Sequence, residues 1–324
     1  MRRILLALGL ALACAAHAQE MTLFVGGLQE SGTTERAPAW AFEYQQGLGE
    51  YFAGSFSWLN EGHVPGHHRD GQAFQLWGRA NLLDRRLSLA FGIGPYRYFD
   101  TSVSSAGGGY ANIHGWGTVS SLAATYYTGR PWFLQLRANR VLAHNSIDTR
   151  SLMLGVGYQL EPVDERGPIK SPPYQWNKTT SDEFTLFAGR TIVNSFESEQ
   201  GVASAFEYRH GLARFIDGTL GFINEGDARL IRRKGVTAQL WAVREVLASD
   251  RLTLGIGYGP YVAIDRYRAP APGEDATARV SLMFTATASY RFGDHWAVRF
   301  SWNRINSHYD RDTDLLLLGI GYRR

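Results

Sequence analysis

A histidine and a serine stand two positions apart at His144 and Ser146, a spacing that could support nucleophilic chemistry. An imidazole beside a hydroxyl can act as its general base, provided that a third group orients the imidazole. The nearest charged groups are Asp148 and Arg150, and His144 falls near a predicted loop tip. We keep His144 and Ser146 as catalytic candidates, and we expect a solvated loop histidine and no enzyme.

A second cluster joins His63, His67 and His68 with Asp70. Imidazole and carboxylate groups in one segment can bind Zn²⁺ or Ni²⁺. Their spacing matches no closed zinc site. We therefore expect neither a metal nor a cofactor, and the three histidines remain metal candidates only.

Polar residues also alternate with apolar ones over long stretches. In residues 296–303, Trp, Val, Phe and Trp alternate with Ala, Arg, Ser and Asn. Such alternation places the two sets on opposite faces of a β-strand. The polar residues that we expect to face inward, lining a lumen, are Glu43, Glu61, Gln75, Arg79, Gln135, Arg137, Asn139, Glu207, Arg209, Glu225, Gln239, Arg299 and Asn303.

The chain contains itself twice. Residues 41–44 (AFEY) recur at 205–208, residues 60–62 (NEG) at 224–226, and residues 75–77 (QLW) at 239–241. The offset stays at 164 or 165 residues, so this is a tandem duplication. We divide the mature chain into repeat 1 (19–160), a proline-rich linker (161–182) and repeat 2 (183–324). His308 matches His144, but Asp310 stands where Ser146 would be, which weakens the catalytic interpretation.

Each repeat predicts eight strands, so the fold class is all-β. In repeat 1 we expect strands at 21–31, 39–48, 51–63, 71–83, 87–103, 116–128, 132–145 and 150–160. In repeat 2 we expect them near 183–194, 203–213, 215–227, 236–248, 251–267, 280–292, 296–309 and 314–324. Short turns alternate with longer polar loops at 31–38, 64–71 and 104–115.

The first eighteen residues predict a secretory signal peptide, with Arg2 and Arg3 before an apolar run and a small-residue cleavage site after Ala18. Cys14 is the only cysteine, so the mature chain forms no disulfide. Of 33 basic residues, 31 remain after cleavage against 30 acidic ones, which does not suggest a nucleic-acid partner. No later apolar run reaches the roughly 18 residues of a transmembrane helix.

Long alternating strands, short turns opposite longer loops, and aromatic residues near strand ends are together typical of membrane barrels. On these features the chain resembles the bacterial outer-membrane β-barrel superfamily over nearly all of its mature length. The aromatic Tyr322 near the C-terminus is similar to the terminal signal of that superfamily, although Arg323 and Arg324 follow it. The resemblance implies a Gram-negative outer membrane, and insertion by the barrel-assembly machinery.

The segment 144–146 (HNS) is also similar to the His-x-Ser motif of the lipid A 3-O-deacylases, which are eight-stranded outer-membrane barrels. That resemblance implies His144 as base and Ser146 as nucleophile, with a glutamate further on to orient the histidine. The following strand, 150–160, offers no glutamate.

Where repeat 1 has its histidine cluster, repeat 2 has basic residues. In an outer loop these would pair with lipopolysaccharide phosphates, and a solvated charge run is the alternative. The residues concerned are Arg229, Arg232, Arg233 and Lys234.

Two architectures are open: one barrel of sixteen strands, which we favour because similar edges can pair between repeats, or two tethered eight-stranded barrels. In a large barrel the inward polar residues would line a channel. In small barrels they would form a structural network. We expect a conduit for polar solutes or a secreted polysaccharide, with a possible periplasmic export partner. The alternatives are a lipid A or phospholipid acyl hydrolase, and a structural or adhesion barrel.

Overall fold

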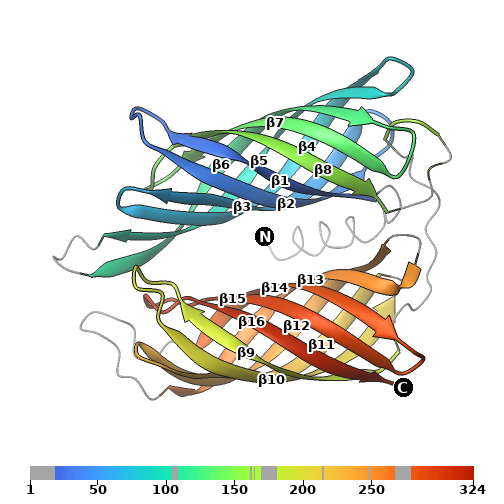
Figure 1. Ribbon diagram of the computed structural model, residues 1–324. Helices are drawn as coiled ribbons and strands as arrows, with labels where there is room; N and C mark the ends of the chain where they lie inside the picture. The colour runs from blue at the N-terminus through green and yellow to red at the C-terminus, as the bar shows by residue number, and fades with distance from the viewer. Residues whose placement is uncertain are drawn as a thin grey trace, which may run out of the picture. The chain divides into compact units, whose positions relative to one another are not determined.

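The computed structural model describes residues 19–103, 109–160, 163, 165–168, 181–213, 215–246, 249–266 and 279–324. The expected signal peptide and most of the linker lie outside these residues. The chain divides into two compact units (Figure 1).

Barrel 1 is a closed ring of eight antiparallel strands joined in chain order. The ring closes where β1 pairs with β8 along its length, from Glu20 opposite Gln159 to Glu30 opposite Thr149. The strands are β1 (Gln19–Glu30), β2 (Arg36–Gly47), β3 (Phe52–Val64), β4 (His67–Leu82), β5 (Leu87–Val103), β6 (Tyr110–Tyr127), β7 (Trp132–Ala143) and β8 (Thr149–Gln159).

Barrel 2 repeats this topology and closes where β16 pairs with β9. Its strands are β9 (Glu183–Val193), β10 (Gln200–Ala213), β11 (Ile216–Ala228), β12 (Ile231–Val246), β13 (Ser249–Arg266), β14 (Val280–Phe292), β15 (Trp296–Asn306) and β16 (Thr313–Arg323). In each barrel we call the end where the first strand begins the linker end, and the opposite end the loop end.

All sixteen expected strands are present, and the all-β antiparallel class is confirmed. The preference for a single sixteen-stranded barrel was wrong, because each repeat satisfies its own edge strands by pairing first with last. The expected loop at 64–71 was also too long. Strand β4 begins at His67, after a turn at 65–66 in which Gly66 adopts a φ of 78°.

The alternation of apolar and polar residues in the sequence corresponds to the outer and inner faces of the barrel walls. Large apolar side chains face outward along the strands, with Leu23 at 70% exposure, Leu76 at 68% and Leu186 at 67%. Their neighbours in sequence point inward and are buried, because successive side chains of a strand lie on opposite faces.

Within the part of the chain that the structure describes, no helix is long and apolar enough to cross a membrane.

The repeated NEG motif makes a β-bulge in both barrels. The pairing of β3 with β4 shifts register between Asn60 and His63, and the backbone N–H of Gly62 donates to Asn60 Oδ1 at 3.1 Å. Gly62 has a φ of 67°, a conformation that glycine adopts without strain. The bulge leaves Glu61 buried on the inward side, at 4% exposure.

Candidate functional site

The thirteen polar residues expected to face inward fill the barrels. Twelve of them are at most 9% exposed, and Glu207 is half-buried. Eight strands leave an interior just wide enough for side chains. These residues therefore contact one another instead of lining a wide aqueous channel.

The loop end of barrel 1 holds a buried cluster around Glu61. Arg69 Nε donates to Glu61 Oε2 at 2.5 Å, and the Tyr96 hydroxyl donates to the same oxygen at 2.7 Å. Thr149 donates to the other carboxylate oxygen and accepts from Arg69 Nη2 at 3.1 Å. A buried charge pair must have its remaining donors and acceptors satisfied, and this cluster does so from four strands.

Barrel 2 repeats the cluster around Glu225. Arg233 donates to both oxygens of Glu225, at 2.5 and 2.8 Å, and the Thr313 hydroxyl donates to Glu225 at 2.7 Å. Arg233 Nη1 reaches the Tyr309 hydroxyl at 2.9 Å. Arg69 is not among the expected lumen residues, because residues 64–71 were expected to form a loop. The signal that could have found it is the recurrence of arginine at the repeat offset.

The prediction that Arg233 contacts lipopolysaccharide is therefore wrong. It is 1% exposed, because the strand that carries it begins at Ile231 and directs the side chain inward to Glu225. Arg232 and Arg229 are exposed and Lys234 is half-exposed.

Arg229 lies in the turn before β12 and contacts two acids of the preceding loop. Its Nη2 is 2.5 Å from both Glu197 Oε2 and Glu199 Oε1. Burial raises the pKa of the Glu199 carboxyl. Hydrogen bonds from Ser195 and Arg229 lower this pKa by a larger amount, so the net shift is downward. This turn is thus already partly neutralised by its own chain.

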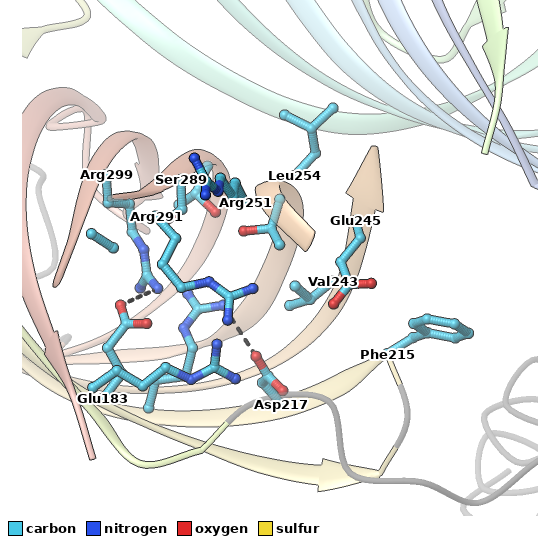
Figure 2. A pocket seen from close by; sticks show the side chains of 15 residues that line it. Glu183, Phe215, Asp217, Val243, Glu245, Arg251, Leu254, Ser289, Arg291 and Arg299 are labelled. Atoms are coloured by element: carbon cyan, nitrogen blue, oxygen red, sulfur yellow. Dashed lines mark hydrogen bonds and ion pairs between the residues drawn. The ribbon is translucent and has the colours of Figure 1, made fainter. Parts of the chain in front are cut away.

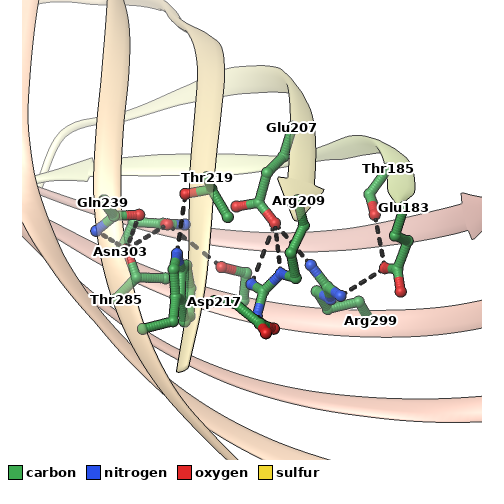
Figure 3. A network of polar contacts seen from close by, with 12 residues as sticks. Glu183, Thr185, Glu207, Arg209, Asp217, Thr219, Gln239, Thr285, Arg299 and Asn303 are labelled. Atoms are coloured by element: carbon green, nitrogen blue, oxygen red, sulfur yellow. Dashed lines mark hydrogen bonds and ion pairs between the residues drawn. The ribbon is translucent and has the colours of Figure 1, made fainter. Parts of the chain in front are cut away.

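A second shared layer crosses the middle of each lumen. In barrel 1, Gln75 donates to Ser121 at 3.0 Å, and Ser121 donates to Asn139 at 2.7 Å. In barrel 2 the corresponding strands supply Gln239, Thr285 and Asn303, which are linked by two hydrogen bonds of 3.0 Å (Figure 3).

Toward the linker end, each barrel places a guanidinium over a buried tryptophan. Arg137 of β7 lies 4.9 Å from the Trp77 ring centroid, and Arg209 of β10 lies 4.0 Å from that of Trp241. The tryptophans correspond between repeats, but the arginines come from different strands. The guanidinium group thus occupies an equivalent position in both barrels, although a different strand supplies it in each.

The ion pairs at this level also differ. Arg137 makes a two-pronged contact with Glu43 in barrel 1. In barrel 2, Arg299 bridges Glu207 at 2.6 Å and Glu183 at 2.5 Å, while Arg209 contacts Glu207 at 3.1 Å (Figure 3).

Beyond these pairs, the linker end of barrel 2 opens into a pocket rich in charge (Figure 2). Arginines and acids of all eight strands of barrel 2 line it, together with the hydroxyls of Thr253, Thr287 and Ser289. The charged lining residues are Arg209, Arg251, Arg291, Arg299, Arg323, Glu183, Asp217 and Glu245.

His144 and Ser146 are not brought together as a base and a nucleophile. The His144 side chain is exposed, and its backbone carbonyl accepts from the Tyr98 hydroxyl. The Ser146 hydroxyl donates to Asp100 Oδ2 at 2.8 Å and accepts from Arg69 Nη1 at 3.1 Å. The serine is therefore part of the loop-end cluster around Arg69.

The three histidines considered as metal candidates flank the turn between β3 and β4, with His63 in β3 and His67 and His68 in β4. The rings of His63 and His68 stack with centroids 3.8 Å apart, and His67 Nδ1 lies 2.7 Å from Asp100 Oδ2. Among the described residues, no three His, Cys, Asp or Glu side chains are arranged to hold a metal ion.

Part of the expected linker folds back on barrel 1. Arg85 donates to Glu165 at 2.7 Å and to the Pro168 carbonyl at 2.6 Å, and Gln159 donates to the Gly167 carbonyl at 3.0 Å. These bonds attach the described residues of the linker to the linker end of barrel 1.

No protein-family model matches the chain, and no curated protein matches its sequence. Solved structures do match, and they include barrel domains, hydrocarbon channels and a porin.

The N-terminal β-barrel domain of Pseudomonas aeruginosa OprF is 11% identical, with a TM-score of 0.34, and covers 43% of this chain and 96% of its own. Ail of Yersinia pestis is 10% identical, with a TM-score of 0.31, over 44% of this chain and 98% of its own. The monoaromatic hydrocarbon channel CymD is 10% identical, with a TM-score of 0.26, over 94% of this chain and 88% of its own.

Proposed function

We propose that this protein is an integral outer-membrane protein whose two barrels are closed at rest, and that it is not an open pore for sugars or polymers. One observation carries the proposal: apolar side chains face outward and stay exposed, while charged and polar side chains face inward and are buried. In water such an arrangement would expose apolar surface at a large cost, whereas a bilayer accepts it. The linker ends then face the periplasm.

The closed lumen follows from what fills it. Trp77, Tyr96 and Arg137 are each at most 3% exposed, so they occupy the interior instead of lining a water-filled path. Trp77 Nε1 donates to Ser55, the Tyr96 hydroxyl donates to Glu61, and Arg137 Nη1 and Nη2 donate to Glu43. Polar groups at membrane depth need such partners.

A second candidate is a narrow conduit for water and small ions, which the pair of Arg137 with Glu43 specifically favours. Leaving one charge of a buried pair without its partner costs about 3–5 kcal/mol, and we take separation of the pair to cost a similar amount. Such a cost keeps the separated state at roughly one molecule in 10² to 10⁴. Conduction of this kind would be brief and rare.

Conductance of the refolded mature chain in a planar lipid bilayer tests both candidates. We expect no long-lived uniform steps from the unmodified protein. Large, stable steps would contradict closed lumens. The double variant Glu43→Gln/Arg137→Gln removes the ion pair without leaving either charge unpaired. A rise in brief openings with this variant would support the ion conduit. If a folded, inserted variant shows no conductance, only the sealed barrel remains as a candidate.

A further inference from the structure

The pocket at the linker end of barrel 2 has a charge pattern that the proposed function does not use. Five guanidinium groups and three carboxylates line it, so its walls carry an excess of positive charge. Figure 2 shows that Arg251, Arg291 and Arg299 approach it from one side, with Glu183 and Asp217 on the other. Two ion pairs lie among the lining residues: Arg299 with Glu183 at 2.5 Å, and Arg209 with Asp217 at 3.5 Å.

The duplication shows that this pocket is a departure from a common plan. Barrel 1 fills the same end with large side chains, and Phe133 and Tyr127 are buried there at 1% and 3% exposure. At the corresponding positions barrel 2 has Ala297 and Arg291, and both line the pocket. Barrel 2 therefore lacks two aromatic rings at this end, and an arginine shares the space that they fill in barrel 1.

The charged residues at this end also differ between the two barrels. Barrel 1 has Arg79 where barrel 2 has Val243, and Arg251 has a counterpart in Arg86. The other four arginines of the pocket stand where barrel 1 has an uncharged residue. Those uncharged residues are Gln45, Tyr127, Gln135 and Gln159.

The buried donors of the pocket are not all satisfied by the protein. Arg299 is 3% exposed, and its Nη1 and Nη2 contact Glu207 and Glu183. Its Nε is buried and has no acceptor among the described residues. A buried N–H without an acceptor costs free energy that an added anion would recover.

We propose that this pocket binds a small oxyanion of the phosphate type. The guanidinium fork matches phosphate oxygens two at a time, and the excess of positive charge favours a divalent or monovalent anion over a cation. The hydroxyls of Thr287 and Ser289 add donors on the same wall. The cavity open to water is about 40 Å³, which suits one phosphate group or a few waters.

Two sources share this chemistry: free inorganic phosphate, and the phosphate of an anionic lipid headgroup. The lipid source rests on the proposed membrane location, whereas the free ion does not. A failure of the membrane proposal would therefore leave phosphate binding in detergent intact.

Calorimetric titration of the refolded mature chain with inorganic phosphate, in a non-ionic detergent, tests the proposal. We expect one phosphate per chain. The variants Arg291→Tyr and Arg323→Gln introduce the residues of barrel 1 at these positions, where a barrel of this plan already accommodates them. Each should weaken binding by about tenfold or more, because each removes charge-assisted hydrogen bonds.

Arg140→Gln, on the exposed face of barrel 1, is the matched control and should bind as the unmodified protein does. If Arg291→Tyr does not fold, Arg291→Lys keeps the charge and loses only the fork, and it should still weaken binding. No heat of binding from the unmodified chain, or equal affinity in the pocket variants and the control, would overturn the site.

A second titration with short-chain phosphatidylglycerol identifies the source. Binding that is displaced by inorganic phosphate assigns the headgroup as well as the ion. Phosphate binding without lipid competition assigns the free ion.

Discussion

Among single residues, Arg137 and Glu43 form the clearest energetic unit of barrel 1. Both side chains are almost fully buried, at 4% and 1% exposure. Whether such a pair stabilises a protein relative to apolar residues varies, but removal of one partner leaves a buried charge without compensation.

We predict that Arg137→Met destabilises the folded protein by about 3–5 kcal/mol, and that adding Glu43→Gln restores much of the loss. Urea unfolding in detergent micelles, followed by tryptophan fluorescence, measures both. The exposed substitution Arg140→Gln should change the free energy of unfolding by less than about 0.5 kcal/mol. A single variant as stable as the parent would show that the pair is solvated.

Ser146 tests the hydrolase alternative at the same scale. Its hydroxyl contacts Asp100 and Arg69, so Ser146→Ala should lower the free energy of unfolding by about 1 kcal/mol. We expect no change in the lipid A acyl pattern of cells that produce the protein, as read by mass spectrometry. Loss of an acyl chain with the unmodified protein, and its return with Ser146→Ala, would instead establish a deacylase.

At the level of elements, the NEG bulge is the device that both barrels share. In barrel 2 the register shifts between Asn224 and Asp227, and Gly226 has a φ of 75°. A Cβ atom on Gly226 would lie 1.9 Å from the Val202 carbonyl oxygen. The bulge is therefore restricted to glycine by sterics as well as by its dihedral angle.

Gly226→Ala should accordingly destabilise barrel 2 more than a glycine substitution that meets only dihedral strain. Gly293 provides that control, since its φ is 80° and an added Cβ meets nothing within 4 Å. We expect about 1–2 kcal/mol for Gly293→Ala. For Gly226→Ala we expect at least about twice that value, since a backbone clash adds to the strain. Equal losses in a urea titration would mean that the bulge relaxes freely.

Across the whole molecule, the two closed rings imply that each repeat is a folding unit. In barrel 1, β1 pairs with β8, and in barrel 2, β9 pairs with β16, so no described strand pairing joins the repeats. We predict that residues 19–168 and 181–324, produced separately, each refold into a heat-modifiable barrel in detergent. Refolding only as a mixture of both pieces would indicate a shared barrel.

The sequence by itself determined the secondary structure and the inside–outside pattern. Alternation is local, since each side chain points away from its neighbour, so the inward placement of Gln75 or Asn303 follows from a few adjacent residues. The tandem duplication likewise predicted two equivalent sets of strands.

Only the tertiary structure decided closure and pairing. The backbone donors and acceptors of β1 and β9 are chemically alike, so nothing in their sequences states whether β1 pairs with β8 or with a strand of the other repeat. The same is true across the lumen, where Arg137 and Arg209 reach equivalent positions from different strands. The pocket of barrel 2 depends on residues such as Glu183 and Arg299, which are far apart in the sequence and meet only in the folded barrel. Such neighbours leave no periodic signal in the chain.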